Sequence, residues 1–207
     1  KARAVDILEK DVEDMNESIE SFINRWESLK PTEMKNWEKD TVDKVFAKLD
    51  NFWAEFEDLK NSANTLSTNC VNFGMSLPRF SSLEVAESDL KSTSDSWNML
   101  REYGEELDKM AQTDWITFRT NVFALEDFGK AWSEKLKERF ADNAHDIVTM
   151  HLNDQLESIK RSMPALKFCR GEPFKEDHWT ELLQGKLRLP SNVRLENLTL
   201  GHFLMVL

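Results

Sequence analysis

The residues that could carry out metal or acid–base chemistry in this sequence are few and poorly spaced for it. There are four histidines, and the two nearest in sequence, His145 and His151, are six residues apart. That spacing puts them on different faces of a helix, so they cannot serve as paired metal ligands. The motifs HExxH and GxSxG, typical of metalloproteases and serine hydrolases, are absent. We therefore predict no catalytic residues and no metal ligands.

Phosphate-binding loops need clustered glycines, and the glycines of this chain are isolated. The six glycines are never closer than fourteen residues, and neither GxxxxGK[ST] nor GxGxxG occurs. Acidic pairs such as Glu105-Glu106 are expected by chance among 38 acidic residues and indicate solvated helix faces. We therefore predict no cofactor in this segment.

The charge and the cysteines limit the choice of partner and compartment. The formal net charge of −11 repels the phosphates of nucleic acid and the surface of an anionic membrane. No apolar run approaches the length of a membrane span, so no membrane insertion is expected. Cys70 and Cys169 lie far apart and form no CxxC motif, which favours a reduced cytosolic compartment.

The elements that hold these residues are predicted to be long amphipathic helices. Apolar residues at alternating spacings of three and four predict one helix that ends at Pro31 and a second that ends near Gly74. Phe46 and Trp53 widen the second stripe, which indicates packing against two partners. The two stripes are Val5, Leu8, Val12, Met15, Ile19, Phe22, Trp26 and Leu29, and Val42, Val45, Leu49, Phe52, Phe56, Leu59, Ala63, Leu66 and Cys70.

Three further helices are expected. Ser81 or Ser82 is expected to cap the third helix, and Asp142-Asn143 the fifth, which Pro164 would kink or end. At Thr113-Asp114 the sequence leaves open whether the helix kinks and continues or breaks and restarts. The three apolar faces are Ala86, Leu90, Trp97, Leu100, Gly104, Leu107 and Ala111; Trp115, Phe118, Val122, Leu125, Phe128, Trp132 and Leu136; and Ile147, His151, Leu152, Leu156, Ile159 and Met163.

The fold class follows from the absence of alternating patterns. No stretch alternates apolar and polar residues over six or more positions, so we predict an all-α fold of long antiparallel helices in a bundle, followed by short helices. The first two helices would pair, and the third and fourth would add to that pair. Short helices are expected at residues 175–184 and from Glu196 or Asn197 onward. Tryptophans should lie in the core, except Trp37, which could be an exposed anchor.

The C-terminal stretch carries a resemblance to a known family. The run Gly171-Glu172-Pro173-Phe174-Lys175-Glu176-Asp177-His178-Trp179-Thr180-Glu181-Leu182, followed by Leu195-Glu196-Asn197-Leu198-Thr199-Leu200-Gly201, resembles the linker region of dynein heavy chains. Upstream stretches resemble the branch of that family that drives retrograde intraflagellar transport. They are residues 4–10, 26–31, 114–120 and 167–172.

The resemblance implies a position in a motor. Residues 1–163 would be a helical tail bundle, and residues 164–207 the truncated start of the linker, the element that bends and straightens over the AAA+ ring. The first residue, Lys1, and the apolar run at residues 203–207 also suggest a segment cut from a longer protein. The segment itself would not be an enzyme, because the ATP sites of the motor would lie beyond Leu207. The residues implied to pack the first linker helices are Phe174, His178, Trp179, Leu182 and Leu183.

The implied partners are the rest of the heavy chain with its AAA+ ring, a second heavy chain and dynein accessory chains. The implied locations are the cytoplasm, the cytoskeleton and the cilium. Two other interpretations remain open from the residues alone. A spectrin-like or coiled-coil adaptor would bind protein partners through its heptad faces, and a helical enzyme would need a polar pocket that the sequence does not reveal.

Overall fold

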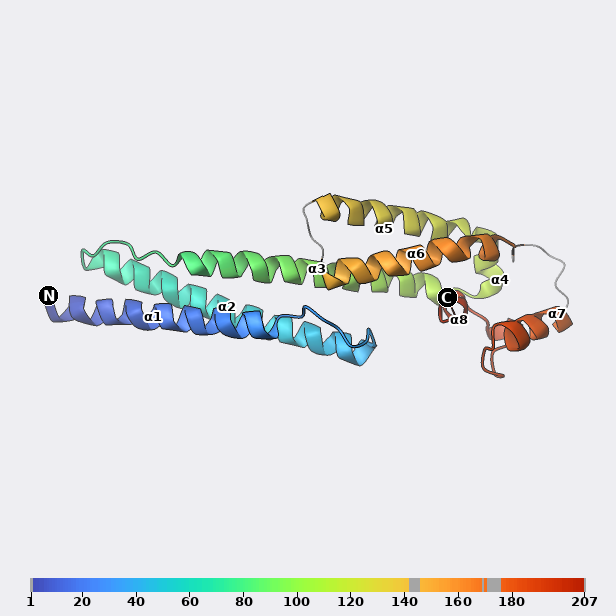
Figure 1. The fold of residues 1–207 in the computed structure, drawn as a ribbon, viewed down its shortest axis with the longest axis horizontal. Helices are drawn as coiled ribbons and strands as arrows, with labels where there is room; N and C mark the ends of the chain where they lie inside the picture. The colour runs from blue at the N-terminus through green and yellow to red at the C-terminus, as the bar shows by residue number, and fades with distance from the viewer. Residues whose placement is uncertain (1, 142–145, 169, 171–175, 207) are drawn as a thin grey trace. The chain divides into compact units, whose positions relative to one another are not determined.

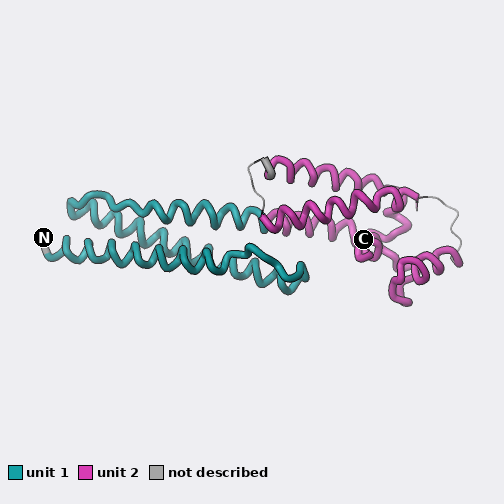
Figure 2. Tube along the Cα trace, in the orientation of Figure 1, with its two compact units in different colours: residues 1–97 teal, residues 98–207 magenta. Residues whose placement is uncertain are grey.

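The computed structural model describes residues 2–141, 146–168, 170 and 176–206, and these residues are almost entirely helical (Figure 1). The described residues contain no β-strand, only an isolated antiparallel bridge between Asp114 and Thr199. The prediction of an all-α fold is therefore confirmed. The chain divides into two compact units, residues 1–97 and residues 98–207, and each is described by itself (Figure 2).

The first unit contains α1 (Ala2–Leu29), α2 (Lys39–Asn72) and the first part of α3 (Ser81–Ala111). α1 and α2 run antiparallel on either side of Pro31, as predicted (Figure 1). Their seam is aromatic, because the Phe52 ring packs edge-on against Phe22 and Trp26 with ring centroids 5.8 Å and 5.1 Å apart. The prediction is wrong for Leu29, which is 48% exposed because α1 ends there.

α2 packs against two partners, as the width of its apolar stripe predicts. On the side of α3, the ring of Phe46 meets that of Trp97 at 5.8 Å, and the Trp53 indole donates a hydrogen bond to the Ser94 hydroxyl at 2.6 Å. Trp37 is not an exposed anchor, because it stacks on the buried Trp97 with ring centroids 5.9 Å apart. α2 ends as predicted, with Gly74 in the left-handed conformation at φ 82°.

The cap predicted for α3 is shifted. α3 begins at Ser81, so Ser81 and Ser82 lie inside its first turn rather than before it. The Leu83 N–H bonds the Phe80 carbonyl at 3.0 Å, and Phe80 packs on the core formed by Leu8, Leu66 and Cys70. Packing of an apolar residue at the helix entry therefore replaces the serine cap.

The second unit begins with the C-terminal part of α3. The helix breaks at Gln112–Asp114. α4 (Trp115–Phe118), a 3₁₀ turn η1 (Arg119–Asn121) and α5 (Phe123–Ala141) follow. All seven residues of the fourth predicted face are buried, although α4, α5 and the turn residue Val122 share them. α5 joins α3 through a 2.8 Å hydrogen bond from the Trp132 indole to Glu106, so the fourth predicted helix belongs to this unit.

α6 (Ile147–Phe168) packs along α5 and does not end at Pro164. Met163 and Leu166 are both buried, so packing on either side of the proline holds the last turn despite the roughly 3 kcal/mol that proline costs a helix. The N-cap is Asp146, whose carboxylate accepts the Thr149 N–H at 2.8 Å. Asp142 and Asn143 lie outside the described residues. The predicted domain boundary at residue 163 stays a prediction.

The C-terminal segment consists of short elements, as predicted. They are α7 (Glu176–Thr180), a π-helical turn η2 (Glu181–Lys186), a 3₁₀ turn η3 (Leu195–Asn197) and α8 (Leu200–Leu204). The last helix begins later than predicted. Thr199 is its N-cap, and its backbone N–H donates a 3.0 Å hydrogen bond to Nδ1 of His202 one turn on.

Candidate functional site

The most specific arrangement in the second unit is the corner between α3 and α4, where the chain meets the C-terminal segment. Residues 113–115 and 198–200 lie antiparallel, bridged at Asp114 and Thr199. The Trp115 N–H donates to the Leu198 carbonyl at 2.8 Å, and the Leu200 N–H donates to the Thr113 carbonyl at 3.1 Å. We call these two three-residue segments and their contacts the junction.

The local sequence explains why the corner is available for pairing. Asp114 has extended backbone angles, and its carboxylate accepts the Thr117 N–H at 2.9 Å as the N-cap of α4. The hydrogen bonds from Thr117 also lower the pKa of Asp114, because they favour its charged form. Thr199 has the same extended geometry as the N-cap of α8. Two helix starts thus supply the two extended residues that bridge.

Trp115 forms the core of the junction. Its side chain is 0% exposed, and its ring centroid lies 4.3 Å from that of Phe203 and 6.5 Å from that of Trp179. Aromatic pairs of this kind contribute about 0.5–1.5 kcal/mol each beyond the area that they bury. Trp115 therefore connects α4 to both α7 and α8 through ring contacts.

A glycine allows the closest approach at the junction. A Cβ atom added to Gly201 would lie 3.2 Å from the carbonyl oxygen of Ala111 at the end of α3 and 3.5 Å from the Ala111 Cβ. A side chain at this position would require a local shift of a few tenths of an ångström, and a branched side chain such as valine would crowd the Ala111 backbone further. Glycine at position 201 therefore lets α8 pack closely against the backbone of α3.

The predicted linker-packing residues lie partly at this junction. Trp179 and Leu183 are 3% and 2% exposed, Leu182 is half-buried, and the His178 side chain is exposed. Of these, Trp179 contacts Trp115 directly. Phe174 lies outside the described residues. A role for this set in packing the first linker helices stays a prediction.

Sequence reasoning missed the partners that complete the junction. Trp115 was assigned only to a core stripe, and Phe203 only to an apolar chain end. The available signals were Asp114, a cap residue directly before a tryptophan, and the polar Thr199 between two leucines. Neither signal shows which distant segment the corner would pair with.

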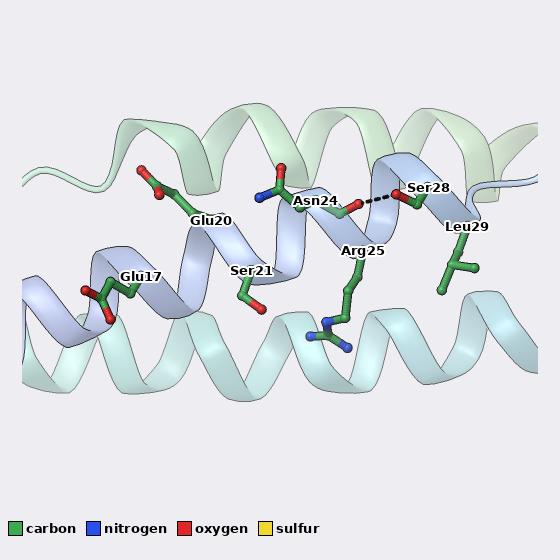
Figure 3. Close-up of a pocket in the computed structure, with 7 residues that line it drawn as sticks. All are labelled: Glu17, Glu20, Ser21, Asn24, Arg25, Ser28 and Leu29. Atoms are coloured by element: carbon green, nitrogen blue, oxygen red, sulfur yellow. Dashed lines mark hydrogen bonds between the residues drawn. The ribbon is translucent and has the colours of Figure 1, made fainter.

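Elsewhere the described residues offer little for chemistry. A shallow, open hollow of about 650 Å³ lies along α1, where Arg25 extends toward α2 and pairs with Glu55 (Figure 3). Glu17, Glu20 and Ser21 also line it, and no histidine or cysteine does. Within the described part of the chain, no group of three His, Cys, Asp or Glu residues could hold a metal ion. None of the described helices is both long and apolar enough to cross a membrane.

The chain is similar to proteins of one family along most of its length. The family model described as "Dynein heavy chain, N-terminal region 2" matches residues 83–206. Relatives named cytoplasmic dynein 2 heavy chain 1 from Mus musculus and Homo sapiens are 31% identical over 192 residues, or 92% of this chain. The relative of that name from Tripneustes gratilla is 27% identical over 199 residues.

The chain spans 4% of the length of the mouse and human relatives and 5% of the sea urchin one. No solved structure matches it. The match is to an N-terminal region of the heavy chain, outside the ATPase ring, so this segment is not itself an enzyme. With more than half of its residues matched by the family model, the chain belongs to the dynein heavy chain family.

Proposed function

We propose that this chain is a mechanical and scaffolding segment of a minus-end-directed microtubule motor for retrograde intraflagellar transport. The names of the relatives, cytoplasmic dynein 2 heavy chain 1, support the choice of motor. The junction is the observation that carries the mechanical role, because backbone pairing and a buried tryptophan fasten the C-terminal segment onto α3 and α4. In this proposal the C-terminal segment is the start of the linker.

The remaining assignments follow from that role. The partners are the rest of the heavy chain with its AAA+ ring, a second heavy chain and dynein accessory chains, and the locations are the cytoplasm, the cytoskeleton and the cilium. The segment holds no cofactor. Phe174, His178, Trp179, Leu182 and Leu183 pack the first linker helices together, and Trp179 also contacts Trp115 of the tail bundle.

The test is the substitution Trp179→Ala in the full-length heavy chain. We expect slower microtubule gliding with ATP hydrolysis retained, since the ATP sites lie elsewhere and only the transmission of movement is impaired. In ciliated cells, the variant motor should accumulate at ciliary tips. Ile116→Ala is the control, because Ile116 lies beside Trp115 in sequence and is 41% exposed.

Two outcomes would contradict the proposal. Unchanged gliding and unchanged stability in Trp179→Ala would remove the mechanical role of this residue. Normal distribution of the variant along cilia, combined with normal gliding, would remove the transport role. If Trp179→Ala does not fold, Trp179→Phe retains an aromatic ring and gives a milder form of the same comparison.

A further inference from the structure

Two routes connect α3 with α8 inside the second unit. The covalent route runs from Asp114 to Thr199 through α4, α5, α6 and α7. The direct route crosses the junction, where residues 113–115 bond residues 198–200. When two routes act in parallel, the shorter and stiffer one takes the load first. The junction consists of only two backbone hydrogen bonds and is the shorter route.

We propose that the junction is a releasable clasp that carries load directly between α3 and the C-terminal segment, and that the α5–α6 hairpin lies outside the load path until the clasp opens. This inference rests on the proposed mechanical function, and it adds which contacts transmit the load. The hairpin would then act as a reserve length of chain that load reaches only after the clasp has failed.

The direction of the bridge explains why the clasp can open. In an antiparallel pair, Thr113 lies opposite Leu200, so the chain coming from α3 and the chain entering α8 leave the bridge at the same end. Tension on these two segments therefore loads the Leu200–Thr113 hydrogen bond first and the Trp115–Leu198 bond second. Bonds loaded one after another resist much less force than bonds loaded together.

Side-chain packing at the loaded end must supply the rest of the resistance. Gly201 lies against the carbonyl of Ala111, one step beyond the first hydrogen bond, and Phe203 packs on Trp115 at 4.3 Å. Opening the bridge from this end first separates Gly201 from Ala111 and then exposes the buried Trp115 ring. The strength of the clasp is therefore set by Gly201, Phe203 and Trp115 more than by the two backbone bonds.

The geometry allows the clasp to be locked covalently. A Cβ atom on Gly201 would lie 3.5 Å from the Ala111 Cβ, and disulfides need Cβ atoms about 3.5–4.5 Å apart. The double substitution Ala111→Cys and Gly201→Cys, with Cys70 and Cys169 replaced by alanine, should form a disulfide under mild oxidation. Mass spectrometry would show the loss of two hydrogens, and reductant would restore the open form.

The experiment stretches the chain from its two ends in an optical trap, with the disulfide reduced or oxidised. In the reduced chain we expect a clasp event first, followed by unfolding of residues 115–198 that releases up to about 300 Å at roughly 3.5 Å per residue. In the oxidised chain both events should disappear. Unfolding of residues 1–97 should be the same in both forms, because these residues lie outside the loop that the disulfide closes.

Gly201→Val tests the clasp without a crosslink. Its side chain would be forced against the Ala111 backbone, so we expect the lifetime of the closed clasp at constant force to fall about tenfold or more, as overpacking usually destabilises. Gly104→Val is the control: Gly104 lies in α3, the helix that carries Ala111, and an added Cβ meets nothing within 4 Å.

Some results would overturn the inference. They are unfolding of α4–α6 before any clasp event, an unchanged unfolding pattern after oxidation, failure of the disulfide to form, or equal effects of Gly201→Val and Gly104→Val. Each of these leaves the proposed function standing, because the gliding of Trp179→Ala is measured separately. Conversely, normal gliding of Trp179→Ala together with a clasp that locks as described would remove the proposed function and keep the clasp as a structural fact.

Discussion

The tryptophan at the junction differs from tryptophans that lie along the helix seams. In residues 1–97 the indole N–H of Trp26 donates to Asp89 at 2.5 Å, and that of Trp53 donates to Ser94 at 2.6 Å. At the junction, Trp115 is 0% exposed, and its indole N–H has no hydrogen-bond partner among the residues that the structure describes. A tryptophan along a helix seam can direct its N–H to a polar residue of the next helix. Trp115 is enclosed by Phe203, Trp179 and backbone groups that already bond each other.

The difference shows two ways of holding helices together. The α1–α2–α3 unit repeats similar contacts along its seams, so the loss of one contact leaves its neighbours in place. The junction depends on a single indole ring that contacts α4, α7 and α8. We therefore expect a single substitution at the junction to weaken several elements at once, and one along a seam to act locally.

The largest effect that this comparison predicts is that of Trp115→Ala. Truncating a fully buried tryptophan typically costs about 3–5 kcal/mol of unfolding free energy, and here the loss should extend to the C-terminal segment. Trp37→Ala is the counterpart in residues 1–97, where Trp37 lies in the loop between α1 and α2. It removes a half-buried ring that stacks on Trp97 and should cost about 1–2 kcal/mol, confined to residues 1–97.

Hydrogen exchange measured peptide by peptide checks both parts of that prediction. For Trp115→Ala, amides in residues 195–206 should lose protection together with those of α4. If the two variants lose amide protection equally and only near the substituted residue, stabilising contacts are no more concentrated at the junction than along a seam.

A smaller effect concerns the hydroxyl of Tyr103, which is also buried and has no hydrogen-bond partner among the described residues. The Tyr103 hydroxyl is buried between Phe128 and Trp132, and burial raises its pKa to about 12. The folded state therefore keeps its proton where the unfolded state has lost it. Ionisation of Tyr103 should therefore leave the free energy of unfolding unchanged below pH 10 and lower it by about 2–3 kcal/mol between pH 10 and pH 12.

The measurement is direct, because Tyr103 is the single tyrosine of the chain. Tyrosinate absorbance near 295 nm should rise with a midpoint near pH 12 in the folded chain and near pH 10 in urea. Tyr103→Phe should lose this alkaline dependence and be about 1 kcal/mol more stable at neutral pH, since it removes an unsatisfied hydroxyl. A folded-state midpoint near pH 10 would mean that water reaches the phenol.

The seams were predictable from the sequence because they are periodic. Spacings of three and four place Phe22, Phe52 and Phe56 on facing helices, and these residues are buried as expected. The same logic found the face from Trp115 to Leu136, since burial depends on the phase of the pattern and not on an unbroken helix. Periodicity says less at helix ends, which is why Leu29 was wrongly assigned to the seam.

The junction could not be predicted because it depends on contacts between residues far apart in sequence. Thr113-Asp114 was compatible with a kink or a break, and pairing with residues 198–200 accompanies the break that the structure shows. Gly201 carries no sign of its role in the sequence, because only the nearby Ala111 carbonyl favours a residue without a side chain there. Trp37 was misjudged for a related reason: its partner Trp97 lies two helices away.

The smallest predicted effect separates the two tryptophan environments most cleanly. Trp26→Phe and Trp115→Phe remove the same atoms from sites that are 1% and 0% exposed, so the loss of ring volume should be similar. Trp26→Phe also removes a hydrogen bond to a charged carboxylate, which should cost about 1.5 kcal/mol more, whereas Trp115→Phe breaks no hydrogen bond. Urea unfolding, followed by hydrogen exchange in each unit, gives the two losses separately.

Asp89→Asn in the Trp26→Phe background should add little, because the carboxylate then has only Lys30 at 3.5 Å to lose. A Trp115→Phe loss as large as that of Trp26→Phe would mean that the indole N–H at the junction does have a partner, and that water enters the site.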